Sequence, residues 1–258
     1  MQRSWTLTDL EFLVLWEELG EEFLPIPLMY ASRTEWWDDH LANVARAKDA
    51  LRDRDPALAE VLPVLRMPDV RVEVRGWDGR DRTSPEASIR MLGIRSGDFG
   101  YLVVQHPGET VRHSAGFTVT EFDAGELAAQ IVAALPDTAA GRGREIVLAE
   151  SEHTDEFDYG YGLSPAHETM EGTVIDRASD FLAAPAPSMG TIDVVQGRSR
   201  FGPRGIIRFQ LEWRDLIDDG RYVVTADFPP VAAPADRKRM TAAVDTRITE
   251  VLMAIEDE

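Results

Sequence analysis

The side chains that could support catalysis are scattered along this sequence and form no recognised catalytic motif. His167 and Glu168 begin a stretch that starts like a zinc-protease helix, but the second histidine that would complete the metal-binding face is absent. Residues 37–40 place carboxylates beside an imidazole, yet the histidines at 40, 106, 113, 153 and 167 lack the spacing of metal ligands. The sequence therefore predicts neither catalytic residues nor a metal site.

Two glycine-containing stretches resemble ligand-binding loops only in part. Residues 215–220 lack the alternating oxygen donors and the terminal glutamate of a calcium-binding loop, so a hairpin turn is the better interpretation. Residues 141–144, Gly-Arg-Gly-Arg, follow an expected helix instead of a strand, which is the wrong context for a dinucleotide-binding loop. We therefore expect no cofactor.

The acidic and aromatic segment 150–162 is the strongest candidate for a functional loop. Its carboxylates and aromatic rings are Glu152, Asp155, Glu156, Asp158, Phe157, Tyr159 and Tyr161. Paired carboxylates can serve as general acid and base, so an enzyme of unknown reaction is one alternative. A solvated loop is the simpler interpretation, and aromatic residues favour contact with another protein, since they are enriched at interface cores.

Composition narrows the classes of partner. The chain has 258 residues, with 27 Lys and Arg against 46 Asp and Glu, which gives a formal net charge of −19. That charge repels phosphate backbones, so nucleic-acid binding is not expected. The sequence has no cysteine, which excludes disulfides and thiolate metal sites. It has neither a signal-peptide pattern nor about 18 consecutive apolar residues, so we expect a cytoplasmic protein that does not insert into a membrane.

The most complete local signal is an N-terminal helix. Thr8 and Glu11 have the spacing of a capping box, and Leu7 and Phe12 occupy the two positions of a hydrophobic staple. Gly20 is a natural stop for this helix. Alternate prolines should keep residues 24–30 extended, and this segment could form a sheet edge.

Two further helices are expected before the first strands. One covers 33–52, with Trp37, Leu41, Val44 and Leu51 facing inward, and the other runs from Asp55 to just before Pro68. The elements after them occur in two similar series. Period-two alternation predicts strands at 70–77, 87–95, 100–106 and 110–118. A capping box at Asp123 and Glu126 then predicts a helix that ends before Pro136.

The second series begins after a short strand at 145–148 and a helix at 164–183 that is interrupted near Gly172. Strands are expected at 191–196, 206–213 and 221–228, followed by a helix at 234–255. A meander followed by a helix thus occurs twice, at 70–135 and 190–256. This order suggests an internal duplication in which both halves share one sheet around a pseudo-twofold axis.

Four ordered stretches resemble the EspG family, the chaperones of actinobacterial type VII (ESX) secretion. They are the helix at 5–20 with Leu24-Pro-Ile-Pro-Leu-Met-Tyr30, Val72-Glu-Val-Arg-Gly-Trp-Asp78, Ala134-Leu-Pro136 with the Gly-Arg-Gly-Arg linker, and Leu211-Glu-Trp213 through Asp219-Gly-Arg-Tyr222 to the last helix. The resemblance implies an α+β fold in one domain over 1–258, with a central, largely antiparallel sheet flanked by helical bundles and quasi-twofold symmetry.

The resemblance also implies a function. Family members are cytosolic chaperones that bind the PPE subunit of a PE–PPE heterodimer at its hydrophobic tip, keep it soluble and deliver it to the ESX machinery. They use no cofactor and are not enzymes. The free protein would be a monomer or a weak dimer. Besides the enzyme, the alternative is a structural partner of the secretion apparatus that delivers no client.

In the family, client contacts come from the central sheet, a loop between early strands and the C-terminal helical bundle. We therefore expect contacts from the loop at 78–86, the exposed face of the second meander around 208–213, and segment 157–161. The expected contact residues are Trp77, Asp78, Arg80, Arg82, Phe157, Tyr159, Arg208 and Trp213. The alternative for Trp77 and Trp213 is a place in the core.

Overall fold

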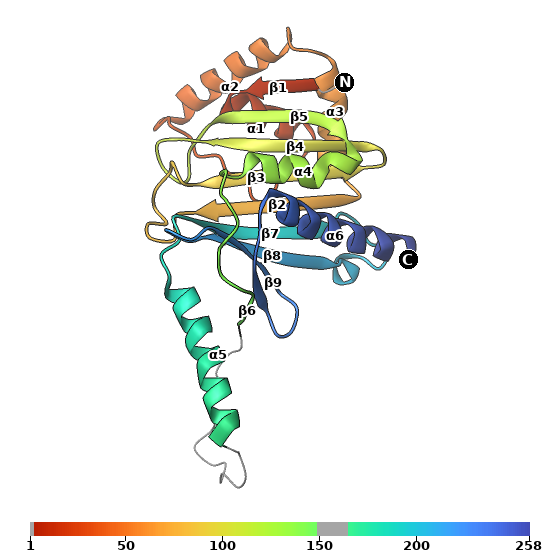
Figure 1. Ribbon diagram of the computed structural model, residues 1–258. Helices are drawn as coiled ribbons and strands as arrows, with labels where there is room; N and C mark the ends of the chain where they lie inside the picture. The colour runs from red at the N-terminus through yellow and green to blue at the C-terminus, as the bar shows by residue number, and fades with distance from the viewer. Residues whose placement is uncertain (1–2, 149–164) are drawn as a thin grey trace.

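One ten-stranded antiparallel sheet connects all parts of the chain (Figure 1). The structure is a computed structural model that describes residues 3–148 and 165–258. Its strand order is β1-β5-β4-β3-β2-β7-β8-β9-β10-β6. The strands are β1 (Arg3–Leu7), β2 (Val70–Trp77), β3 (Ile89–Ser96), β4 (Phe99–Pro107), β5 (Ser114–Asp123), β6 (Ile146–Val147), β7 (Ser188–Gln196), β8 (Arg208–Asp215), β9 (Arg221–Thr225) and β10 (Val231–Pro234).

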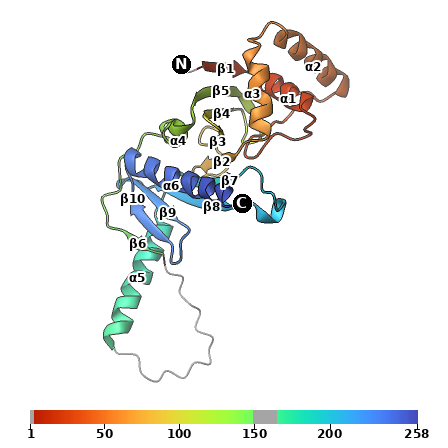
Figure 2. The same cartoon turned by 90° about the vertical axis from the view of Figure 1, so that its right-hand side faces the viewer.

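Helices cover different parts of the two faces. They are α1 (Asp9–Glu18), α2 (Trp37–Leu51), α3 (Ala57–Arg66), α4 (Leu127–Ala134), α5 (Pro165–Ala183) and α6 (Arg237–Glu256), with 3-10 turns η1 (Ala124–Glu126) and η2 (Pro203–Gly205). Helices α4 and α6 contact each other on one face. The side view shows α1, α2 and α3 together on the opposite side, near β1 and β5, while α5 extends away from the other end of the sheet (Figure 2).

The two predicted meanders lie side by side in the one sheet, as expected. Strands β2 and β7 pair along their length at its centre, from Val70 opposite Gln196 to Trp77 opposite Met189. On one side of this seam β2–β5 are followed by α4, and on the other β7–β10 are followed by α6. The expected α+β fold with a largely antiparallel sheet is confirmed. The description of 1–258 as one domain with two related halves stays a prediction.

The main core lies between the centre of the sheet and the pair α4 and α6. Alternate residues of β2 and β7 enter it, and Trp213 of β8 is its largest fully buried side chain. The Trp213 ring packs directly on two glycines, Gly76 and Gly190. The contact is so close that a Cβ at either position would collide with the indole. The packing of the sheet centre therefore requires glycine, which has no side chain, at both of these positions.

A second core lies under α1 and α3, on the opposite face near β3, β4 and β5. Phe12 of α1 stacks on Phe117 of β5 with ring centres 4.5 Å apart. The predicted capping box is present: Glu11 N donates to Thr8 Oγ1 at 3.2 Å, and Thr8 N donates to Glu11 Oε2 at 2.8 Å. This confirmed cap begins the helix that holds the second core.

The structure corrects the expected edge of the sheet. The edge strand beside β5 is β1, while residues 24–30 form no strand. Strand β1 pairs with β5 from Arg3 opposite Glu121 to Leu7 opposite Phe117. Prolines at 25 and 27 cannot donate to a ladder, whereas every residue of β1 can.

The structure also corrects four local predictions. Strand β5 begins at Ser114, because the Thr110 hydroxyl is hydrogen-bonded to His113 Nδ1 at 2.8 Å in a turn. It runs on to Asp123, which pairs with Phe99 and forms no capping box. Residues 226–228 lie outside β9, and the chain returns as an unpredicted strand, β10. Helix α5 runs through position 172 without a break.

Helix α2 faces solvent more than its pattern predicts. Trp37 is 70% exposed and Leu41 is 48% exposed, although both are expected to face inward, and Ala47 is the buried residue of this helix. The physical reason is that α2 packs against α1 and not against the sheet, so only part of its apolar surface has a partner.

We predict that the Gly190→Ala variant is much less stable than the wild type. The new methyl group would overlap the Arg75 carbonyl oxygen and the Trp213 ring, so the free energy of unfolding should fall by about 1–3 kcal/mol or more. The matched control is Gly125→Ala, where a Cβ meets nothing within 4 Å and the change should stay within about 0.5 kcal/mol. Urea denaturation measures both, and equal effects would contradict this account of the sheet centre.

Candidate partner-binding surface

The side chains of β2, β7 and β8 that point away from the main core form a charged sheet face. We use this name for Arg71, Glu73, Arg75, Asp193, Arg208 and Gln210. Residues opposite each other in an antiparallel pair share a face, and Glu73 is opposite Asp193, which is opposite Gln210. The neighbouring parts of this side of the sheet are covered by α1 and α3 near β4 and β5, and by Phe181 of α5 over Tyr222.

Two buried carboxylates lie at the centre of this face under arginine side chains. Glu73 is 1% exposed and Asp193 is 3% exposed. Arg71 Nε lies 3.0 Å from Glu73 Oε1, and Arg75 Nη2 lies 3.5 Å from Glu73 Oε2. Arg208 lies between both acids, 3.8 Å from Asp193 and 4.0 Å from Glu73. Gln210 Nε2 donates to Asp193 Oδ1 at 3.1 Å.

The electrostatics of this face differ from those of the whole chain. Burial raises the pKa of Glu73 above its ordinary value, and Arg71, Arg208 and Arg75 oppose that shift. Burial also lowers the pKa of Arg90, which lies opposite Arg75 in β3, and the charge of Arg75 adds to that effect. Glu73 and Asp193 are thus sequestered while the guanidinium groups stay accessible, with Arg208 51% exposed. Glu212, in the same row of β8, adds one exposed carboxylate to this side of the sheet. A chain of net charge −19 presents hydrogen-bond donors here.

The predicted contact loop continues from the end of this face. Trp77 follows Arg71, Glu73 and Arg75 in the same alternating row of β2. The Arg82 guanidinium lies 4.8 Å from the centre of the Trp77 ring, an arrangement that a cation–π interaction favours. The buried Trp77 Nε1 has no hydrogen-bond partner among the described residues. Trp77 is therefore a half-buried ring at the margin of the face, shielded by Arg82.

An ion pair within the loop fixes its first turn. Arg80 donates to Asp78 through Nε at 3.0 Å and Nη2 at 2.7 Å, and its backbone N–H also donates to Asp78 at 2.8 Å. These hydrogen bonds lower the pKa of Asp78 to about 2. Gly79 N donates to Ala186 O at 2.9 Å, which ties the loop to the segment before β7.

The structure brings five of the eight predicted contact residues to this region: Trp77, Asp78, Arg80, Arg82 and Arg208. It places Trp213 elsewhere, because β8 alternation turns this side chain into the main core, where it is 0% exposed. Trp213 therefore presents no surface, which corrects its expected role. Phe157 and Tyr159 lie outside the described residues.

Sequence reasoning missed the centre of the face. The signal was present in residues 70–75, where valine alternates with Arg71, Glu73 and Arg75, a pattern with one apolar and one charged face. The pairing of Glu73 with Asp193 joins residues 120 positions apart and was not visible in that pattern. Among residues 3–148 and 165–258, no three His, Asp or Glu side chains converge as a metal site. In the same part of the chain, no helix is both long and apolar enough to cross a bilayer.

Comparison with known proteins shows similarity over nearly the full length of the chain. The sequence model of the EspG family matches residues 8–246. Among solved structures, the chain is similar to the Mycobacterium tuberculosis type VII secretion system chaperone EspG5, solved in complex with the PE25–PPE41 dimer. The TM-score is 0.54 at 15% identity, and the alignment covers 98% of this chain and 97% of that one. No curated protein sequence matches the chain.

We predict that Glu73 makes stability depend on pH. Its folded-state pKa lies above the ordinary value of 4.5, so the folded protein holds a proton that the unfolded chain releases in that interval. The stabilising contribution of this proton should therefore be lost as pH rises from the unfolded-state pKa to the folded-state pKa of Glu73. The Glu73→Gln variant lacks this titration, so the free energy of unfolding of the wild type, relative to the variant, should fall between about pH 4 and pH 7. Urea denaturation at both pH values measures the difference, and a constant difference would contradict the pKa shift.

Proposed function

The chain belongs to the EspG family, and from that premise we propose that it is a cytoplasmic chaperone of a type VII (ESX) secretion system. In this proposal it binds a PE–PPE-type substrate at the hydrophobic tip of the PPE subunit, keeps the substrate soluble and delivers it to the secretion machinery. The observation that carries the proposal is the family match over residues 8–246. The EspG5 fold, found in complex with PE25–PPE41, supports it.

The charged sheet face and its adjoining loop are our proposed client surface. The arginines of the face can donate to backbone carbonyls and carboxylates of a client, since guanidinium groups carry several donors in a fixed geometry. Aromatic rings border both ends of the central strands. Trp77 ends β2 beside Met189, and Phe201, 67% exposed, lies in the connection that follows Gln196. The aromatic rings can contact apolar side chains of a client, and the arginines between them can contact its polar groups.

A chaperone role makes physical sense for such a surface. An exposed apolar tip promotes aggregation, and covering it removes apolar area from water. The buried acids keep the arginine heads in place before binding, so less side-chain order has to be gained when the client docks. We propose no reaction: the carboxylates of segment 150–162 lie outside the described residues, and no observation on the described ones favours the enzyme alternative.

We predict that charge reversal on this surface reduces client binding and leaves the protein folded. With a PE–PPE pair co-expressed, Arg208→Glu and the double variant Arg80→Glu/Arg82→Glu should each lower client recovery in a pull-down by about tenfold or more, because they place a repelling charge at the contact. The loop arginines are the sharper test of folding: Arg80 is 54% exposed, so the double variant should change the melting temperature little. Arg208→Glu also removes the cation between the buried acids Glu73 and Asp193, so its melting temperature should fall as well.

The matched control is Arg237→Glu, an exposed residue at the start of α6 on the other face of the sheet. It makes the same change in net charge as Arg208→Glu, and it should bind the client normally. Normal recovery with every variant would place the client surface elsewhere. A wild-type chain that recovers no PE–PPE pair would favour the structural-partner alternative.

A further inference from the structure

Two adjacent tryptophans at the start of α2 are exposed in a fold that buries most others. Trp36 is 68% exposed and Trp37 is 70% exposed, whereas Trp5, Trp16 and Trp213 are at most 8% exposed. Three further large apolar side chains nearby are exposed as well: Phe23 at 76%, Ile26 at 56% and Leu41 at 48%. Exposed apolar side chains that gather in one region mark sites of interaction with other molecules.

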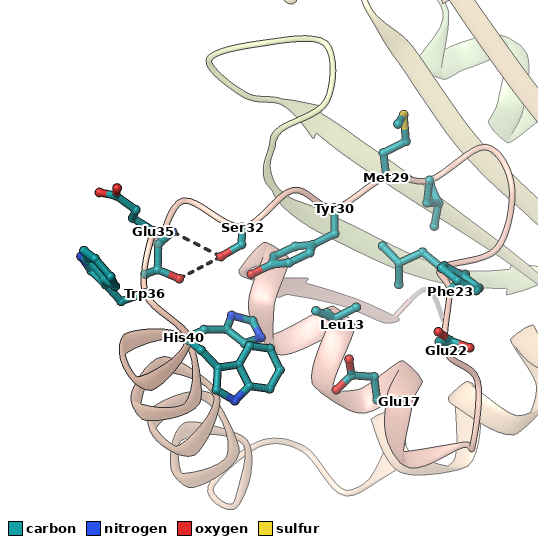
Figure 3. Close-up of a pocket in the computed structure, with 14 residues that line it drawn as sticks. Leu13, Glu17, Glu22, Phe23, Met29, Tyr30, Ser32, Glu35, Trp36 and His40 are labelled. Atoms are coloured by element: carbon teal, nitrogen blue, oxygen red, sulfur yellow. Dashed lines mark hydrogen bonds between the residues drawn. The ribbon is translucent and has the colours of Figure 1, made fainter.

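Trp36, Trp37 and Phe23 line a pocket of about 640 Å³ between α1, the segment after it and the start of α2. Figure 3 shows Leu13, Glu17 and Tyr30 across its middle, with His40 toward one end and Phe23 and Glu22 toward the other. Its floor is apolar, because Leu13 and Leu28 are buried there. Burial also raises the pKa of Tyr30. A cavity of this size and lining is typical of ligand sites and of grooves for apolar anchors.

The charges around this pocket are negative and unmatched. Its lining includes the carboxylates of Glu17, Glu22 and Glu35, and no lysine or arginine. None of the described cations lies at salt-bridge distance from these three acids. The nearby cations already have partners: Arg33 pairs with Asp9 and Glu109, Arg66 with Glu21, and Lys48 with Glu18. An occupant that matches this charge must be cationic.

From this geometry we infer a second docking site, at which the pocket binds an apolar and cationic segment of a partner protein, such as an amphipathic helix that carries lysine or arginine. Apolar side chains would fill the pocket beside Trp36 and Trp37, and the cations would lie near Glu17, Glu22 and Glu35. The tryptophan faces also favour cations. The site lies beside α1 and α2, and α1 packs on β5, apart from the charged sheet face at β2, β7 and β8.

A second copy of the chain fits this pocket poorly. Twofold dimers place the same patch of each copy against itself, which would bring the three carboxylates of one copy onto those of the other. Each copy also carries a net charge of −19. The partner is therefore a different protein with the opposite charge.

The test uses two synthetic 18-residue helical peptides of about equal amphipathicity, one of leucine and lysine and one of leucine and glutamate. In isothermal titration with the full chain, the lysine peptide should bind and the glutamate peptide should not. The double variant Trp36→Ala/Trp37→Ala should weaken the lysine peptide at least tenfold without any change in net charge. Because both rings are exposed, the variant should keep its melting temperature.

A second variant separates this site from the general acidity of the chain. Glu17→Gln/Glu22→Gln/Glu35→Gln should weaken binding and reduce its salt dependence. The control Asp123→Asn/Glu126→Gln/Asp218→Asn changes net charge equally at exposed positions elsewhere and should bind as the wild type does. Equal weakening by both triple variants, or full binding by the tryptophan variant, would overturn the inference.

Two further readouts keep this inference distinct from the client surface and from self-association. PE–PPE recovery should be unchanged by Trp36→Ala/Trp37→Ala, so the two surfaces can succeed or fail separately. Sedimentation velocity should show no dimer that depends on the tryptophans. A dimer that dissociates in the tryptophan variant would assign the pocket to a second copy and overturn the inference.

Discussion

Strands β2 and β7 pair along the whole length of β2 and join the N-terminal and C-terminal halves of the chain into one sheet. This seam determines what each face carries. Val72, Val74 and Val194 turn toward α4 and α6, so the same pairing turns Glu73 and Asp193 to the opposite side. A shift of one residue would exchange the two sets. The core and the proposed client surface therefore depend on one register.

The charged sheet face has an energetic cost that a purely structural sheet would avoid. Like charges directly opposite each other are unfavourable, and buried acids lose hydration that nearby arginines only partly replace. A packed apolar layer at Glu73 and Asp193 would serve stability as well or better. The buried acids instead hold Arg71, Arg75 and Arg208 in fixed positions at an open surface, which is a functional reason to retain them at a cost in stability.

The two halves of the chain use their helices differently. Helices α4 and α6 cover the sheet centre from one side, and α1 and α3 cover β3, β4 and β5 from the other. This leaves two regions without cover among the described residues: the charged sheet face and the surface of α2 with its pocket. One presents arginines and the other presents tryptophans and carboxylates. The two proposed surfaces therefore differ in chemistry and would select different partners.

Much of the fold followed from local patterns, because caps and alternation act over a few residues. The capping box of Thr8 and Glu11 and the bounds of β2 agree with expectation. The order of the elements was also enough for the resemblance to the EspG family, which the match over residues 8–246 confirms. Tertiary structure decided what depends on distant residues. Only the β2–β7 register could bring Glu73 to Asp193, and only the position of α2 away from the sheet could leave Trp37 exposed while Trp213 is buried over Gly76 and Gly190. A helix pattern shows which residues are apolar, but it does not show which of them will have a surface to pack against.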